Sequence, residues 1–277
     1  MAAGALAFAL AVAALPAEAT SAKIRSAGRP DVRAGSYVVL DEEGGRVLAA
    51  HKENLAAPIA SITKLMTALV VLEAGQPLSE TLAIGPAELR GTRGSASRLA
   101  AGVLLTRGEL LRLALMSSEN RAASALCHYY PGGQARCVAA MNAKAAALGM
   151  SRSHFIEPTG LSPQNVASPR DLARLVMAAS ANPVIADFST ASKYTVTLRR
   201  QRTEFHTTNP LVKSSAWQIA VQKTGYISEA GRCMVMRTII DGRDVVIVLL
   251  GAWGTQTRIA DARRIRSWIE TRRPGLG

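Results

Sequence analysis

Residues 60–69, ASITKLMTAL, place a serine and a lysine three positions apart at the beginning of an apolar run. On a helix, residues with this spacing lie on one face, so Ser61 and Lys64 would point the same way. A serine hydroxyl becomes a strong nucleophile when a neighbouring group takes its proton, and a lysine can do so if burial or a second cation keeps it neutral. So short a pattern is frequent by chance, and on its own it is better explained as a solvated turn of a surface helix.

A second polar group, Ser118-Glu119-Asn120, separates two predicted helices within LMSSENRAASAL. In a loop, a serine and an asparagine two positions apart can project together into a cleft. There Ser118 could relay a proton, and Asn120 could hold a substrate amide and the head of Lys64. The alternative is an ordinary turn between helices, where serine and asparagine are favoured in any case.

A third group, Lys223-Thr224-Gly225, lies at the end of a predicted strand near the edge of a sheet. Lysine and threonine together can bind a carboxylate, and glycine allows a substrate backbone to approach the strand closely. The alternative is a plain strand end with a solvated lysine. Each group is weak evidence alone, but all three in this order, on a helix, a loop and a strand, form a specific pattern.

The hydrophobic pattern predicts strands at both ends of the chain and helices between them. Residues 36–40 and 46–50 form one predicted hairpin, and residues 233–240 and 245–250 form another around Asp241-Gly242. Helices are predicted over residues 62–73, 122–129, about 134–148 and 259–269. Two more are predicted to begin at the capping box Thr106-Arg-Gly-Glu109 and at Ser168-Pro169. Residues 194–198 and 217–221 are predicted to be extended. This order predicts an α+β protein with one antiparallel sheet, built from N- and C-terminal strands, and a mostly helical region inserted between them.

The N-terminus has the composition of an export signal. Residues 2–15 are almost wholly small or apolar, and Ala17-Glu18-Ala19 fits a cleavage site, although a basic segment before the apolar run is missing. A buried N-terminal helix is the alternative. No later apolar run is long enough to span a bilayer, so the mature protein is predicted to have no transmembrane segment. We predict a signal peptide at 1–19, a flexible mature N-terminus at 20–35, a single catalytic domain at 36–277 and a periplasmic location.

The formal net charge of the chain is +13 at pH 7, and loss of Glu18 with the signal removes one negative charge and raises it to +14. Such a basic protein is expected to bind an anionic surface, or simply to be kept soluble by its charge. Export argues against nucleic acid as a partner, and so does the lack of a Lys/Arg run interleaved with aromatic residues. Acidic lipid and an acidic cell-wall polymer remain as anionic partners, and the charge suits the wall polymer.

The sequence predicts different states for the three cysteines. In an oxidising compartment Cys127 and Cys137 could form a disulfide over a short loop, but their spacing does not require it. Cys233 lies in an apolar run and is predicted to be a buried thiol. No spacing of potential ligands resembles a metal site, so neither a metal nor another cofactor is predicted.

The three motifs in this order resemble those of the penicillin-binding proteins and class A β-lactamases. The stretches ASITKLMTALVVLEAG, LALMSSENRAASAL, YPGG, MNAKAAALGM, EPTGLS and QKTGYISEAGRCMVMRT are similar to the low-molecular-mass D-alanyl-D-alanine peptidases, the S11 serine peptidases. In particular they resemble the exported D,D-endopeptidase branch, the penicillin-binding protein 7 type, over roughly residues 36–270. Many carboxypeptidase relatives have Asp-Ala after the second motif, and Arg121-Ala122 here fits the endopeptidase branch.

The resemblance implies how an acyl group would be transferred. Ser61 would attack the carbonyl of a D-alanine and form an acyl-enzyme, and Lys64 would take the hydroxyl proton. Ser118 would pass a proton to the leaving amine. Asn120 would position both the substrate and Lys64.

The resemblance also implies how the substrate would be bound. Lys223 and Thr224 would bind the substrate carboxylate, Gly225 would let the substrate come close, and Lys223 would help to keep the other lysine neutral. The oxyanion would lie between the backbone amides of Ser61 and Tyr226. A D-Ala–D-Ala terminus, a cross-link between D-alanine and meso-diaminopimelate, and a penicillin all have a carboxylate beside the scissile amide. Penicillins and other β-lactams are therefore expected to acylate the same serine.

The motifs alone do not choose between the reactions of this family. The chain ends within a few residues of its last predicted helix, without room for a β-rich C-terminal domain or an amphipathic membrane anchor, which favours a periplasmic D,D-endopeptidase over a D,D-carboxypeptidase. A class A-like β-lactamase would need a deacylating glutamate, and Glu157 in EPTGLS is the candidate. In the related peptidases this segment is a structural loop, so a β-lactamase is less favoured, as is a non-catalytic penicillin-binding module.

Overall fold

The computed structural model describes residues 28–43, 45–92 and 94–272 of the chain. The predicted signal peptide, residues 1–19, and residues 20–27 of the predicted flexible segment, which spans residues 20–35, lie outside these ranges. Among the described helices, none is both long and apolar enough to cross a membrane.

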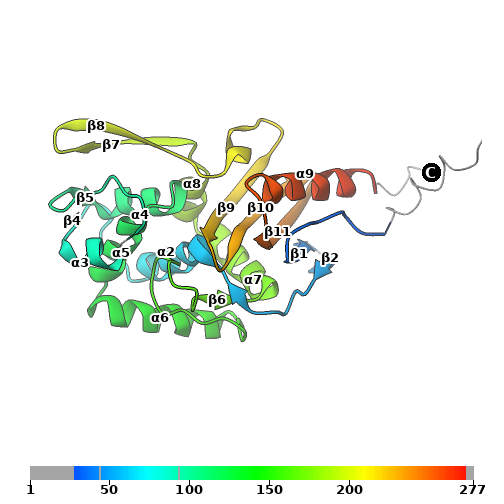
Figure 1. The fold of residues 1–277 in the computed structure, drawn as a ribbon, viewed down its shortest axis with the longest axis horizontal. Helices are drawn as coiled ribbons and strands as arrows, with labels where there is room; N and C mark the ends of the chain where they lie inside the picture. Colours follow the sequence, from blue (N-terminus) through cyan, green and yellow to red (C-terminus); the bar gives the residue numbers. More distant parts are fainter. Residues whose placement is uncertain (1–27, 44, 93, 273–277) are drawn as a thin grey trace, which may run out of the picture.

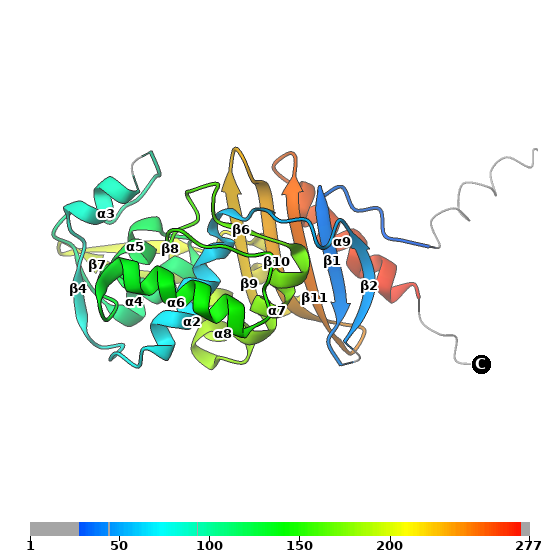
Figure 2. The same ribbon diagram turned by 90° about the horizontal axis from the view of Figure 1, so that it is seen from below.

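One antiparallel sheet of five strands forms the centre of the fold (Figure 2). The strands are β1 (Ser36–Asp41), β2 (Arg46–His51), β9 (Gln218–Ile227), β10 (Gly231–Ile240) and β11 (Arg243–Ala252). Their order is β2-β1-β11-β10-β9, so strands from the two ends of the chain lie side by side. Val248 of β11 shows this directly, because it pairs with Val38 on one side and with Val235 on the other. The predicted α+β class and the sheet of N- and C-terminal strands are confirmed.

Both faces of this sheet are buried, which explains the almost continuous apolar runs of β10 and β11. Alternate side chains of a strand point to opposite faces. In β11, Val248 belongs to the core shared with the helical region, and Leu249 belongs to a second core. Helix α9 (Thr257–Glu270) covers the second core, and α7 (Pro169–Ser180) packs against the opposite face of the sheet (Figure 1).

The helical region lies between β2 and β9 in the sequence and beside the β9 edge of the sheet (Figure 2). Its helix α2 (Thr63–Glu73) is completely buried from residue 63 to residue 71, which explains the length of the apolar run after Lys64. The other helices of the region are α3 (Pro86–Gly91), α4 (Arg107–Met116), α5 (Asn120–His128), α6 (Gly133–Ala147), α7 and α8 (Pro183–Thr190), and a 3₁₀ turn, η1 (Ala60–Ile62), precedes α2.

Local caps begin two of these helices where the sequence predicts them. At α4, Thr106 Oγ1 accepts from the Glu109 amide at 3.2 Å, and the Glu109 carboxylate accepts from the Thr106 amide at 2.7 Å. At α7, Ser168 Oγ accepts from the Asp171 amide at 3.2 Å. These side chains satisfy amides that no carbonyl of the same helix can reach.

Several small elements have no counterpart among the predicted ones. Strand β8 (Gln201–His206) pairs with β7 (Lys193–Leu198) in a hairpin that lies along the helical region, where Val196 and Phe205 join its core (Figure 1). Its sequence QRTEFH is mostly polar because most of its side chains are exposed. Helices α3 and α8 are short, with six and eight residues, so their hydrophobic period does not stand out from the surrounding sequence.

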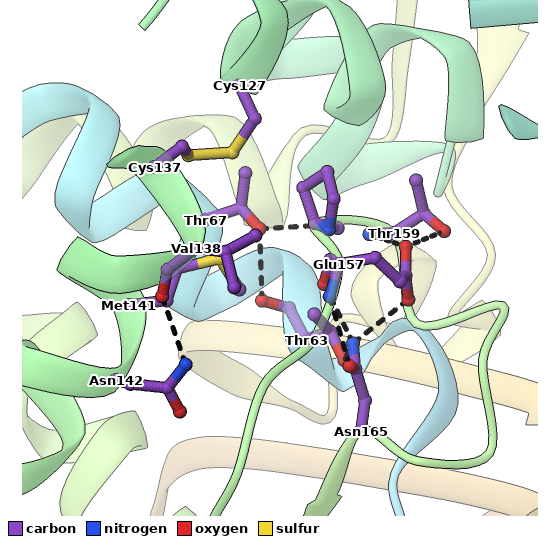
Figure 3. The surroundings of a disulfide bond; sticks show 11 residues. Thr63, Thr67, Cys127, Cys137, Val138, Met141, Asn142, Glu157, Thr159 and Asn165 are labelled. Carbon is purple, nitrogen blue, oxygen red and sulfur yellow. Dashed lines mark hydrogen bonds between the residues drawn. A yellow bond between two sulfur atoms is a disulfide. The ribbon is translucent and has the colours of Figure 1, made fainter. Parts of the chain in front are cut away.

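Cys127 and Cys137 form a disulfide, which answers the question that their spacing leaves open (Figure 3). The bond joins the last turn of α5 to α6, and the two Cα atoms are 5.4 Å apart. Cys233 is a buried free thiol, as predicted, and burial raises its pKa to about 11. The disulfide therefore connects the helix that begins at Asn120 to its neighbour in the helical region.

Candidate active site

Ser61 lies in the 3₁₀ turn that leads into α2. The Thr63 hydroxyl donates to the Ala60 carbonyl oxygen at 2.8 Å and holds this turn. Ala60 has a φ of +47°, in the left-handed region that non-glycine residues rarely adopt, so the chain bends sharply just before the serine. Ser61 Oγ lies 2.8 Å from Lys64 Nζ. The structure thus brings the predicted nucleophile and base into hydrogen-bonding contact.

Lys64 contacts three oxygen atoms in an almost closed site. Besides Ser61 Oγ, its Nζ lies 2.7 Å from Asn120 Oδ1 and 2.6 Å from the Thr159 carbonyl oxygen. A neutral amine has two N–H donors and one lone pair. Asn120 and Thr159 can accept the two hydrogens, which leaves the lone pair facing the Ser61 hydroxyl. The three contacts therefore suit the neutral lysine that can take the serine proton.

The rate of Ser61 acylation should fall as the pH drops below about 7. The Lys64 side chain is only 1% exposed, and burial lowers its pKa to about 7 even though the charges of Glu157 and Glu119 favour its protonated form. Below that pH a proton occupies the lone pair that Ser61 needs, so the rate should fall about tenfold per pH unit. Stopped-flow acylation by a fluorescent penicillin between about pH 5 and 9 measures this, and a flat profile over that range would contradict a neutral-lysine base.

The second motif forms the break between α4 and α5. Ser118 has a φ of +61°, and Glu119 begins α5 by accepting from the Arg121 amide at 3.1 Å. Asn120, the first residue of α5, directs its Oδ1 at Lys64. Among the described residues, no hydrogen bond joins the Ser118 hydroxyl to Lys64. The turn therefore brings Asn120 onto the lysine and leaves Ser118 partly exposed beside it.

The Lys-Thr-Gly motif lies within β9, the edge strand of the sheet, and not at its end. Lys223 is fully buried, and its Nζ donates to the Thr224 carbonyl oxygen at 2.8 Å. Burial, followed by the charges of Lys64 and Arg258, lowers the pKa of Lys223. Two ammonium groups in one buried site disfavour each other's charge. This is the electrostatic relationship that the family resemblance implies for the two lysines.

Two glycines pack against the turn that carries the nucleophile. A Cβ added to Gly225 would lie 3.0 Å from both the Ser61 amide nitrogen and the Ile59 carbonyl oxygen, so β9 runs directly against the turn. A Cβ added to Gly160 would lie 1.9 Å from the Ala60 carbonyl oxygen, and Gly160 also has a φ of +81°. Only glycine fits at position 160 without a change in the backbone.

Glu157 organises the loop that carries Thr159 and Gly160 (Figure 3). Its carboxylate accepts from the Thr159 amide, the Thr159 hydroxyl and the Gly160 amide, each at 2.6 Å. Asn165 Nδ2 donates to the same carboxylate at 2.9 Å and to Thr63 Oγ1 at 3.1 Å, which connects the loop to the nucleophile turn. With these donors around it, Glu157 acts as a positioning residue. This geometry agrees with a structural loop and not with a deacylating base.

Comparison with known proteins identifies the family. The family model described as D-alanyl-D-alanine carboxypeptidase, peptidase family S11, matches residues 23–254. The chain belongs to this family.

Two members of the S11 family that are similar to this chain are named endopeptidases. The D-alanyl-D-alanine endopeptidase of Pseudomonas aeruginosa is 47% identical over 243 residues, which cover 87% of this chain and 78% of that protein. The D-alanyl-D-alanine endopeptidase of Escherichia coli is 43% identical over 269 residues, which cover 96% of this chain and 87% of that protein. Among solved structures, a mutant of the Streptomyces K15 DD-transpeptidase is 26% identical, with a TM-score of 0.80 and coverage of 88% of this chain and 100% of that chain. The predicted resemblance and fold are confirmed.

The site of this S11 peptidase also contains residues that the sequence did not reveal. Arg258, near the beginning of α9, donates through Nη1 to the Gly225 and Cys233 carbonyl oxygens at 2.8 and 3.1 Å. In the sequence, an arginine of an amphipathic helix looks like part of a solvated face. The segment EPTGLS, which contains Thr159 and Gly160, is one of those that resemble the family, so the sequence indicated that it is important. The sequence did not indicate that the Thr159 carbonyl contacts Lys64. Within the described residues, no group of three or more His, Cys, Asp or Glu could hold a metal ion.

Proposed function

We propose that this S11 peptidase is a serine D,D-endopeptidase that hydrolyses the amide between D-alanine and the D-centre of meso-diaminopimelate in peptidoglycan cross-links. The observation that carries the proposal is the 2.8 Å contact between Lys64 Nζ and Ser61 Oγ, in a site where burial brings the pKa of Lys64 to about 7. This arrangement suits acyl transfer. The relatives with 43–47% identity are named endopeptidases, which favours a cross-link over a terminal D-alanine as the substrate.

Acylation begins when Ser61 Oγ attacks the D-alanine carbonyl carbon and its proton passes to Lys64. The developing oxyanion lies between the backbone amides of Ser61 and Tyr226, two segments that the close packing of Gly225 keeps side by side. The proton then passes from Lys64 through the Ser118 hydroxyl to the nitrogen of the leaving diaminopimelate. The C–N bond breaks, the amine leaves, and the D-alanyl group remains on Ser61 as an ester.

Hydrolysis of this ester repeats the proton transfers with water as the nucleophile. Lys64 takes a proton from the attacking water and returns it to Ser61 Oγ as the ester bond breaks, which releases the D-alanine carboxylate. Asn120 holds Lys64 and the substrate amide, and Lys223 and Thr224 bind the carboxylate beside the scissile bond. Both half-reactions therefore use one base.

The same site supports a second activity and an inhibitor class. A terminal D-Ala–D-Ala has the same carboxylate beside its scissile amide, and the matching family model is described as a carboxypeptidase, so D,D-carboxypeptidase activity is the second candidate. β-Lactams acylate Ser61 in the same way. Their acyl-enzyme should persist, because the Glu157 carboxylate, the candidate deacylating base, already accepts several hydrogen bonds from its own loop. This argues against a β-lactamase.

We further propose that the chain is exported through a signal peptide at residues 1–19 and acts in the periplasm, with residues 36–277 as one catalytic domain. The apolar N-terminal run and the Ala17-Glu18-Ala19 site support export. The disulfide between Cys127 and Cys137 suits an oxidising compartment. The net charge of +13 suits an acidic wall polymer as the partner and does not require nucleic acid.

Mass analysis of muropeptides tests the reaction. The mature protein and its Ser61→Ala variant are incubated with purified cross-linked dimers and, separately, with monomeric pentapeptides. Conversion of dimers to monomers only with intact Ser61 is the expected result. Loss of the terminal D-alanine with dimers untouched would make the protein a carboxypeptidase, and no change in either substrate would favour a non-catalytic penicillin-binding module.

A further inference from the structure

A stacked tyrosine and arginine lie directly beyond the Lys-Thr-Gly motif. Tyr226 follows Gly225, and its side chain is 57% exposed. Arg232 of β10 pairs with Tyr226 of β9, and its guanidinium carbon lies 4.7 Å from the centre of the tyrosine ring. Because Gly225 packs against the Ser61 amide, the pair lies at the rim of the reaction site. An exposed aromatic ring held by a cation in this place can contact substrate.

The pair points to the same side of the edge strand as a predicted carboxylate-binding group. Thr224 pairs with Met234, and Met234 packs in the core beneath α9. Since alternate residues of a strand share a face, Thr224, Tyr226 and Arg232 all face the α9 side. Arg258 of α9 is bonded to the backbone of the same two strands. Burial, followed by the charge of Arg232, lowers the pKa of Arg258.

In the part of the chain that the structure describes, no ion pair joins these cations to an acid. Among the ion pairs within the described residues, none involves Lys223, Arg232 or Arg258, whereas Arg237 farther along β10 pairs with Glu42 and Asp244. Unpaired cations around a partly exposed site attract anions. One carboxylate, beside the scissile amide, is assigned to Lys223 and Thr224. Arg232 remains available for a second.

We propose that Arg232 and Tyr226 bind a second carboxylate on the leaving side of the substrate and thereby favour cross-links over a terminal D-alanine. The inference rests on the proposed endopeptidase function. A terminal D-alanine leaves with one carboxylate, whereas the leaving stem peptide of a cross-link has further carboxylates, such as that of its D-glutamate. A guanidinium can bind such a group through two parallel hydrogen bonds, and the Tyr226 ring can cover apolar atoms of the stem.

The test measures how the variant Arg232→Gln acts on three substrates: a cross-linked dimer, a monomeric pentapeptide and a penicillin. For the cross-linked dimer, kcat/KM should fall about 10- to 100-fold, mainly through KM, because one charge-assisted contact is lost. For the monomeric pentapeptide and for acylation by a penicillin, the change should stay within about twofold, since neither has a second carboxylate on the leaving side of its scissile amide. Arg232→Lys should recover part of the loss, because it restores the charge without the planar fork.

Arg152→Gln is the matched control, because it removes the same charge from an exposed arginine in the turn after α6. An equal loss on dimer and pentapeptide, or slower penicillin acylation, would overturn the inference by placing the effect of Arg232 in the common site. An equal loss with Arg152→Gln would attribute the effect to net charge and overturn it as well. The wild-type protein tests the proposed function separately, because failure of that function appears as uncleaved dimers before any substitution is made.

Discussion

Replacement of Lys64 by methionine is expected to slow acylation of Ser61 by about 10³-fold, the usual loss when a positioned general base is removed. Methionine nearly fills the space of the lysine stem but provides no lone pair at the position 2.8 Å from Ser61 Oγ. The Asn120 and Thr159 oxygens lose their donor, which costs about 1–3 kcal/mol for each buried acceptor that water cannot reach. Removal of a buried ionisable group offsets part of that cost.

Covalent labelling by a fluorescent penicillin, followed over time by intact-mass analysis, measures this loss. Lys144→Met is the control, because Lys144 lies on α6 and pairs with Glu73 outside the site. The control should acylate at the wild-type rate. A Lys64→Met protein that is folded, as judged by its thermal transition, and that acylates within tenfold of the wild type would remove Lys64 from the role of base.

Replacement of Gly160 by alanine should lower the free energy of unfolding by about 3 kcal/mol and also impair acylation. The new Cβ would meet the Ala60 carbonyl oxygen at 1.9 Å, at a φ of +81° that alanine adopts with strain. The backbone must move, and both sides of the contact belong to the site. One side carries Ser61, and the other carries the Thr159 carbonyl that accepts from Lys64. We therefore expect a loss of stability together with a fall of about tenfold or more in the acylation rate.

The control variant Gly75→Ala separates the effect of backbone strain at a positive φ from the effect of the contact with Ala60. Gly75 also has a left-handed φ, +69°, but an added Cβ there meets nothing within 4 Å. Its substitution should cost only the conformational strain, about 1 kcal/mol, with normal acylation. Urea unfolding and penicillin labelling of both variants give the comparison. Equal effects at the two positions would mean that strain alone, and not the contact with Ala60, accounts for the change at Gly160.

Most strands of the five-stranded sheet and most helices could be predicted because their local signals agree with their surroundings. Apolar runs joined by Asp241-Gly242 predict β10 and β11, and the caps at Thr106 and Ser168 predict where α4 and α7 begin. β8 was not predicted because most of its residues are exposed, so its sequence does not alternate between apolar and polar residues. The strand of the Lys-Thr-Gly motif was predicted too short, since its central residues Gln222, Lys223 and Thr224 are polar although they are buried.

The order and spacing of three short motifs in the sequence were enough to identify Ser61, Lys64, Asn120 and Lys223 as candidates, because each chemical role requires a particular side chain. Only the tertiary structure decided the state of those groups. Asn120 and Thr159 are 56 and 95 positions from Lys64, yet both contact its Nζ. The pKa of Lys64 depends on the water excluded by all of its neighbours together, and no local stretch of sequence contains that sum. The same holds for Arg258 and Arg232, which long-range strand and helix packing brings to the edge of the site.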